Sequence, residues 1–444
     1  MKKQEQKIFS PDWLECHPYK QSGNTDLYYI KLANQVLYAI DETSVNFDDE
    51  NDFFLSQEEK KTLSCLLTAY FEDIISETNI WNTFVRLSKE KYGTYLPFYQ
   101  TEEYYEEEIN LIDIKFLCWH YLTQLNKGYI SISPNEAFID EIADKVFPIF
   151  DNAFEEAPEN TKLKALFELN EEDENLYTIQ SKFYQLCIET YLFHFDSLDL
   201  TEELNDVTQV AKENNLEDKV IEMANMVMTD FSFNNVTEFF NLTSPQWLAK
   251  ILGEENSLYE PLMELSKKKS GYFVFVEQDS MYAQFRHVAT GEILHVTNRS
   301  LVGFPKDMKS EEVILFAGFV QWQSEWWFIG DLRSYENTEE LVKEIEALED
   351  ERNLFNERPD LPFNEEQQDK ISQNYLKYQK EENPDDNQEE LEWTLFFCDG
   401  INTDYLKNAI IENKYPGIKF PGENGKELLL KNIDFVLSYF RREL

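Results

Sequence analysis

Residues 319–330 read FVQWQSEWWFIG, and this stretch decides how the chain folds. Alternate side chains of a strand face opposite sides. Trp326 and Phe328 should therefore face one way, and Trp327 and Ile329 the other. A strand that is apolar on both faces is usually covered on both. The stretch predicts a wall between the interior of a small β module and the helices packed outside it.

The alternative is an exposed aromatic surface of the kind that stacks on nucleic acid bases. Such surfaces lie among cations, whereas Glu325 and Asp331 flank this strand. Residues 271–333 contain five Lys and Arg against eight Asp and Glu. The charge balance favours the wall over the open binding face.

The acidity extends over the whole chain of 444 residues, which has 86 Asp and Glu, 40 Lys and Arg, and a net charge of -46. Such a field repels the phosphates of DNA and RNA and anionic lipid surfaces. It attracts basic proteins, polyamines and divalent cations. The alternative is that most of these carboxylates only solvate the surface.

The expected compartment is the cytoplasm. The first residues, MKKQEQKIFSPDW, carry lysines without the apolar run of a signal peptide. No apolar stretch reaches the about 18 residues of a membrane span. The five cysteines are scattered and never spaced as CxxC, which is typical of free thiols.

Apolar spacing predicts a helical domain over residues 1–267. Ser56 and Glu59 form a capping box before one helix, and Ser133-Pro134-Asn135-Glu136 predicts another start. Residues 109–125 are apolar around most of a helix, so we expect a buried central helix there. Apolar residues that recur at helical spacing from Leu176 to His194 predict a further helix, and others are expected near 202–229, 245–252 and 258–267.

Strand-like runs fill residues 268–335 and predict an antiparallel β module, barrel-like or strongly curved. Turns are expected at 289–292 and 323–325. Helical spacing returns in residues 336–444, where Asn337 and Glu340 form a box-like cap. Residues 379–392 are charged and are the predicted flexible segment, and 427–440 reads as a helix. The fold class is therefore α+β.

Several stretches together resemble an uncharacterised bacterial family, a domain of unknown function. They are PDWLECHPY (11–19), TDLYYIKLAN (25–34), DIKFLCWHYL (113–122), TGEILHVTNRSL (290–301) and EWWFIG (325–330). The resemblance implies a bacterial cytosolic protein. It implies no activity, cofactor or catalytic residue.

Motifs that carry chemistry are missing from the sequence. There is no GxGxxG, GxxxxGK[ST], GxSxG or HExxH pattern. Residues 48–59 place acidic side chains at four calcium-loop positions, Asp48, Glu50, Asp52 and Glu59. Phe53 stands where that loop needs glycine. We therefore expect no metal site and no cofactor.

Four residues are weak catalytic candidates. His287 and His295 flank the predicted turn at 289–292, where a bulge or an odd loop would bring the imidazoles together. A regular register leaves them on opposite faces, which is the favoured interpretation. His194 and Asp196 could pair only if the helix ended there. His120 is expected to be a core histidine, and His17 part of a turn that closes the N-terminus onto the bundle.

We therefore expect a non-catalytic, acidic interaction protein that binds a basic protein partner, without nucleic acid or membrane. The alternative is an enzyme, hydrolase-like and of unrecognised type, with a site between the helical and β domains. The sequence leaves the oligomeric state open.

Overall fold

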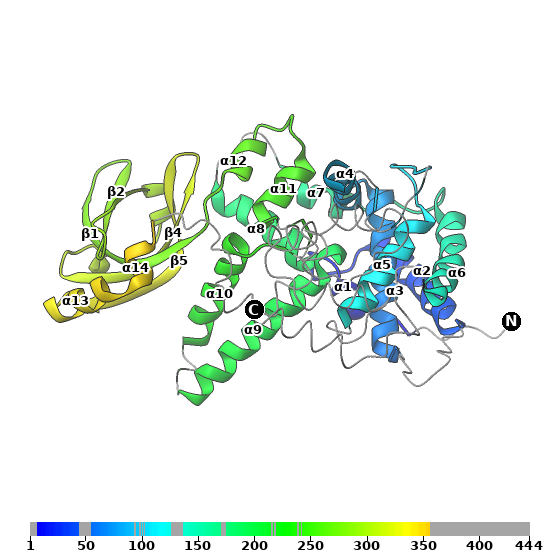
Figure 1. The fold of residues 1–444 in the computed structure, drawn as a ribbon, viewed down its shortest axis with the longest axis horizontal. Coiled ribbons are helices and arrows are strands. Elements are labelled where there is room, and N and C mark those ends of the chain that lie inside the picture. The colour runs from blue at the N-terminus through cyan, green and yellow to red at the C-terminus, as the bar shows by residue number, and fades with distance from the viewer. Residues whose placement is uncertain are drawn as a thin grey trace, which may run out of the picture.

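The computed structural model describes residues 7–43, 55–92, 95–96, 99, 101, 103–125, 136–169, 175–214, 216, 219–237, 239–240 and 242–355. Helices come first along the chain and a five-stranded β module follows (Figure 1). In Figure 1 the helices that precede the strands occupy the middle and right of the view, and the strands lie at the left with the two helices that follow them. The predicted α+β class is confirmed.

The helical part contains a bundle followed by a second group of helices that lies next to the β module (Figure 1). The bundle helices are α1 (Ser10–Leu14), α2 (Asn24–Asp41), α3 (Gln57–Ser76), α4 (Ile80–Tyr92), α5 (Leu111–Leu125), α6 (Ala137–Ala153) and α7 (Thr161–Phe167). The second group comprises α8 (Leu176–Glu189), α9 (His194–Glu213), α10 (Val220–Asn234), α11 (Ser244–Leu252) and α12 (Tyr259–Met263).

Two sequence predictions about the bundle are confirmed. The Ser56 hydroxyl accepts from the Glu59 amide at 3.3 Å, and the Glu59 carboxylate accepts from the Ser56 amide at 2.6 Å. This capping box starts α3 where the sequence placed it. Helix α5 is buried over nearly its whole circumference: ten of the eleven residues from Asp113 to Thr123 are buried, and Lys115 is the exception. The Ser133-Pro134 cap lies outside the described residues, and α6 has Glu136 as its N-cap.

The helix predicted from Leu176 to His194 is wrong from Thr190 onwards. Helix α8 ends at Glu189, a 3₁₀ turn covers Tyr191–Phe193, and α9 begins at His194. Thr190 has an extended backbone, and its hydroxyl donates to the Leu186 carbonyl at 2.6 Å. The residues after the break stay buried, so apolar spacing could not reveal it. The helix expected near 202–229 is likewise divided between α9 and α10.

The strands are β1 (Lys269–Gln278), β2 (Tyr282–His287), β3 (Ile293–Thr297), β4 (Val313–Trp322) and β5 (Glu325–Glu336). They form a closed ring in the order β1-β2-β3-β5-β4, because β4 also pairs with β1. All neighbours are antiparallel except β3 and β5, which pair in parallel. An odd number of strands cannot alternate in direction around a closed ring. The sheet is therefore mixed, not fully antiparallel as predicted.

The two predicted turns lie between paired strands. Gly291 has a φ of 74° between β2 and β3, a conformation that glycine adopts without strain. Gln323 and Ser324 have φ values of 48° and 68° between β4 and β5. Two positive values in a two-residue loop are typical of the tightest hairpins.

The aromatic strand β5 is buried on both faces and separates the interior of the β module from the helices, as its sequence predicts. Trp327 and Ile329 belong to the core of the helical part, and both are buried. Trp326 and Phe328 pack into the interior of the β module. One strand therefore contributes side chains to two hydrophobic cores.

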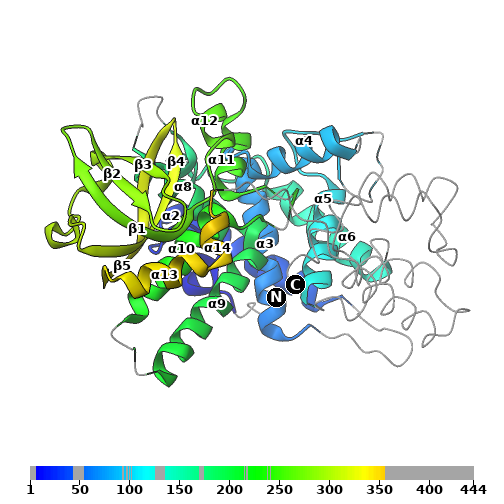
Figure 2. The same cartoon turned by 60° about the vertical axis from the view of Figure 1, so that its left-hand side comes forward.

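Two further helices, α13 (Glu339–Ala347) and α14 (Glu349–Asn353), follow β5 along the edge of the β module (Figure 2). The N-cap of α13 is Thr338, whose hydroxyl accepts from the Leu341 amide at 3.2 Å. The predicted cap, Asn337, instead donates its amide group to the Glu311 carbonyl at 2.7 Å. The predicted flexible segment 379–392 and helix 427–440 lie outside the described residues.

The burial of β5 on both faces can be tested by comparing its two neighbouring tryptophans. Trp327→Ala should lower the free energy of unfolding by about 3–5 kcal/mol, because it removes a fully buried indole from the core of the helical part. Trp326→Ala should cost less, because Trp326 is only partly buried. Urea unfolding followed by circular dichroism measures both. Met281→Ala, at a side chain that is 62% exposed, is the control. A larger loss for Trp326 than for Trp327 contradicts the assignment of the two faces.

Candidate functional site

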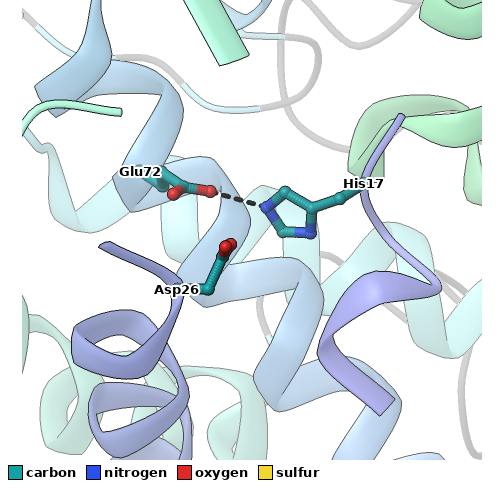
Figure 3. Close-up of side chains that lie close together, drawn as sticks. All are labelled: His17, Asp26 and Glu72. Carbon is teal, nitrogen blue, oxygen red and sulfur yellow. Dashed lines mark hydrogen bonds and ion pairs between the residues drawn. The ribbon is translucent and has the colours of Figure 1, made fainter. Parts of the chain in front are cut away.

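His17, Asp26 and Glu72 form a buried cluster between three segments of the bundle (Figure 3). His17 lies in the turn after α1, Asp26 in the first turn of α2, and Glu72 in α3. Their exposed fractions are 1%, 1% and 0%. One nitrogen or oxygen of each lies within 4.8 Å of the others.

The imidazole of His17 is held at both nitrogens. Nδ1 lies 2.9 Å from the carbonyl oxygen of Trp13, and Nε2 lies 2.6 Å from a carboxylate oxygen of Glu72. A carbonyl oxygen only accepts, so Nδ1 carries a hydrogen. Burial disfavours the imidazolium. The negative charge of Glu72 and the hydrogen bonds to Glu72 and Trp13 outweigh it and raise the pKa of His17 above its ordinary value.

Neutral donors surround the two carboxylates. Asp26 accepts from the Trp13 indole at 2.9 Å and from the Tyr19 hydroxyl at 2.7 Å. Its second oxygen accepts from the amide of Gly23 at the start of α2. Burial and the two nearby carboxylates raise the pKa of Tyr19, so this phenol keeps its proton and remains a donor.

Asn160 connects the cluster to α7. Its amide nitrogen donates to Glu72 and to the Tyr19 hydroxyl, both at 2.8 Å. Its carbonyl oxygen accepts from the Leu163 amide at 3.1 Å and caps α7. The polar contacts of the cluster thus join the N-terminal turn, α2, α3 and α7.

A second buried network surrounds Asp113 of α5. Its carboxyl accepts from the hydroxyls of Tyr70 at 2.6 Å and Tyr104 at 3.0 Å. Burial raises the pKa of Asp113 to about 7, against the opposing effect of these hydrogen bonds. Asp73 of α3 is bound in the same manner by the Tyr191 hydroxyl at 2.7 Å and the Trp81 amide at 2.7 Å.

The structure does not bring His287 and His295 together. His287 is buried, with Nε2 at 2.8 Å from Glu351 of α14 and Nδ1 at 2.9 Å from Thr290. His295 is exposed and lies opposite Gln284 in the β2–β3 pair, so its side chain points to the outer face. The favoured sequence interpretation, two histidines on opposite faces, is confirmed.

His194 and Asp196 occupy the first turn of α9. Two positions on a helix differ by about 200° around its axis, so these side chains point apart. Burial lowers the pKa of His194 to about 4, which keeps its imidazole neutral. His120 stacks on Phe116 with its ring centroid 6.2 Å away, as a histidine of the aromatic core. In the calcium-like loop Glu59 serves the capping box, and Asp48, Glu50 and Asp52 lie outside the described residues.

Local sequence pattern contains only a weak signal for the His17 cluster. His17 was expected in a turn, which is correct, but Glu72 lies 55 residues further along the chain. The one available signal was Glu72 itself, a charged residue between Phe71 and Ile74 on the apolar face of α3. A carboxylate in such a position needs a partner that local spacing cannot identify.

These features define the class: an α+β protein with a helical part organised around buried carboxylates. Residues 7–282, more than half of the chain, match the family described as "Protein of unknown function (DUF3843)", and the chain belongs to that family. The match ends at the start of β2, so the resembling stretches at 290–301 and 325–330 lie beyond it. No curated protein and no solved structure matches the chain. Among the described residues, no helix combines the length and apolar character needed to cross a membrane.

The pKa of Asp113 predicts a pH dependence of stability. Its folded pKa of about 7 exceeds the ordinary value of 3.8, so its contribution is full below about pH 4 and is lost as the pH rises towards 7. Relative to Asp113→Asn, the wild-type free energy of unfolding should fall by roughly 1–3 kcal/mol between pH 5.5 and 8. Urea titrations at each pH measure it. The exposed Asp206→Asn is the control, and equal pH slopes for wild type and Asp113→Asn contradict the prediction.

The His17 cluster predicts that substituting His17 lowers the stability of the fold much more than substituting an exposed histidine. His17→Gln should lower the free energy of unfolding by about 3–5 kcal/mol, because it leaves Glu72 as a buried carboxylate without its charged partner. His295→Gln changes an exposed side chain and should cost less than about 0.5 kcal/mol. Urea unfolding at pH 7 compares the two variants. Similar losses in both variants contradict a role for the His17–Glu72 pair.

Proposed function

We propose that this protein is a non-catalytic interaction protein whose acidic surface binds a basic protein partner. The observation that carries the proposal is an acidic ridge along one edge of the β module, where exposed carboxylates gather. The acidic ridge consists of Glu311, Glu312, Glu336, Glu339, Glu340, Glu344, Glu346, Glu349 and Asp350. Lys343 and Arg352 are the cations in the same segments.

Backbone contacts hold the parts of the acidic ridge together. Glu336 at the end of β5 pairs with Val313 at the start of β4. The amide of Asn337 donates to the Glu312 carbonyl at 2.9 Å. Helix α13 then buries Ile345 against Val274 and Ile314 of the β module. Its remaining faces are left to solvent, so the acidic side chains are exposed on a helix that is fixed to the β module.

The ridge has the electrostatics of a recognition surface for cations. Within the described part of the chain, the glutamates from 336 to 346 form no ion pair, so their charges remain available. Like charges on one support within a Debye length, about 10 Å at 0.1 M salt, add their fields. Such a field accelerates association with a basic protein and repels polyanions.

The arrangement of the histidines supports a non-catalytic role. His287 and His295 lie on opposite faces of the β2–β3 pair. The cluster at His17 is fully buried, and every polar atom discussed there already has a protein partner. General acid–base catalysis requires a group within hydrogen-bond reach of a substrate.

We also propose the bacterial cytoplasm as the compartment. Cys16, Cys65, Cys118 and Cys187 are buried free thiols in the described part of the chain. Burial raises the pKa of Cys16 to about 12, so this thiol stays protonated and unreactive. Unpaired cysteines are typical of reducing compartments.

The proposed binding can be tested with a lysine- and arginine-rich peptide of about 20 residues, labelled with a fluorophore. Fluorescence anisotropy would measure its dissociation constant for the full chain at low salt and at 0.3 M salt. The quadruple variant E339Q/E340Q/E344Q/E346Q should weaken binding at low salt by about tenfold, because it removes four charges from the ridge. Added salt should weaken wild-type binding strongly.

The matched control is E155Q/E156Q/E254Q/E255Q, which removes the same charge from exposed positions of the helical part. It should change the dissociation constant less than about twofold. Equal weakening by both quadruple variants would show that only the net charge matters and would overturn the ridge as the binding surface. Wild-type binding that salt leaves unchanged would overturn the electrostatic proposal.

A further inference from the structure

We propose that the cluster of His17, Asp26 and Glu72 is a binding site for one divalent first-row transition metal ion, of the zinc or manganese class. The ligands would be Nε2 of His17 and one carboxylate oxygen from each acidic residue. The inference goes beyond the proposed function and does not depend on it, because the cluster lies in the bundle and the acidic ridge in the β module (Figures 1 and 3).

The first argument is the charge of the cluster. Two buried carboxylates face one imidazole, so the group keeps a formal negative charge even when His17 is protonated. In the described part of the chain, no lysine or arginine forms an ion pair with Asp26 or Glu72. The ammonium of Lys162 instead lies over the Tyr19 ring, 3.9 Å from its centroid. A divalent cation would supply the charge that these side chains lack.

The second argument is the orientation of His17. Its Nδ1–H donates to the Trp13 carbonyl, which directs Nε2 towards the two carboxylates. Metal-bound histidines in proteins typically donate their other ring N–H to a carbonyl or carboxylate, which fixes the tautomer and the ring orientation. The carbonyl of Trp13 lies outside the cluster and performs this role before any metal is present.

The third argument is the spacing of the ligand atoms. Without a metal, Nε2 and the Glu72 oxygen are 2.6 Å apart and are joined by a hydrogen bond. Bonds of about 2.0–2.2 Å to a first-row metal separate ligand atoms by roughly 3–3.5 Å. The ligand atoms here lie within 4.8 Å of one another. A metal that replaced the proton would therefore need movements of about 1 Å or less.

The surroundings also hold the carboxylates in place. The Trp13 indole and the Tyr19 hydroxyl donate to Asp26, and Asn160 donates to Glu72. Such outer hydrogen bonds orient carboxylate ligands and tune their affinity. The mixed nitrogen and oxygen set fits zinc, manganese or iron(II) better than calcium or magnesium, which prefer oxygen alone. A bound ion would join α2, α3 and the N-terminal turn, and its role would be structural.

The test uses the full chain after treatment with a chelator and buffer exchange. Zinc or cobalt(II) is added in twofold excess, unbound metal is removed by gel filtration, and bound metal is measured by plasma mass spectrometry. The cobalt form is also examined for visible d–d absorption. We expect about one ion per wild-type chain and a rise of several degrees in the thermal midpoint, because the ion binds the folded state.

Four variants make the test specific to this site. H17Q and E72Q should each lose the ion. H295Q removes an exposed histidine, and H287Q removes a buried histidine that faces only the single carboxylate of Glu351. Both should keep about one ion per chain. Absence of metal from the wild type, or equal uptake by H17Q, would overturn the proposal.

A second measurement on the wild type covers the outcome in which H17Q or E72Q does not fold. Nitrogen-15 NMR of the histidine side chains reports the state of each ring nitrogen, and the signals of His17 are assigned by elimination through glutamine variants of the other four histidines. With excess zinc, Nε2 of His17 should lose its proton and shift as a metal-bound nitrogen. Retention of protons on both nitrogens of His17 in excess zinc would show an ordinary buried ion pair and would overturn the metal site.

Discussion

Burial of both faces of β5 is the constraint on which the rest of the structure depends. The strand contributes Trp327 to the core of the helices and Trp326 to the interior of the β module. Helix α8 fixes it from outside, because the Tyr177 ring contacts Trp327 edge to face and its hydroxyl donates to the Phe328 carbonyl at 2.7 Å. Removing the β module from the helices would expose these side chains to water, at a cost that scales with their large apolar area.

The buried carboxylates of this acidic chain are stabilised in a particular way. Lysine and arginine are few, and the buried carboxylates are bound mainly by phenol, indole and amide donors instead. Tyr19 donates to Asp26, Tyr70 to Asp113 and Tyr191 to Asp73. These three tyrosines thus have a polar role inside the bundle as well as an apolar one. Hydrogen bonds to a charged acceptor are stronger than those between neutral groups, which makes this substitution for cations possible.

Much of the fold follows from local pattern. The two-residue period of β5 predicted which tryptophans share a face, and the capping box at Ser56 predicted where α3 begins. The sequence did not predict the break between α8 and α9 at Thr190. The residues on both sides of it are buried, so the apolar spacing continues through a change of direction. The parallel pair of β3 and β5 was also missed, because sequence spacing indicates strands but not the closure of a ring.

The candidate site illustrates the limit most clearly. By itself the sequence determined the α+β class, the burial of α5 and β5 and the acidic exterior, since each depends on composition or on the spacing of near neighbours. It also favoured opposite faces for His287 and His295, because a regular strand register gives that relation unless a bulge or an odd loop intervenes. Only the tertiary structure decided that His17 meets Glu72, a residue 55 positions away. The physical reason is that this contact depends on how α1 and α3 pack, and no local period records the distance between separate helices.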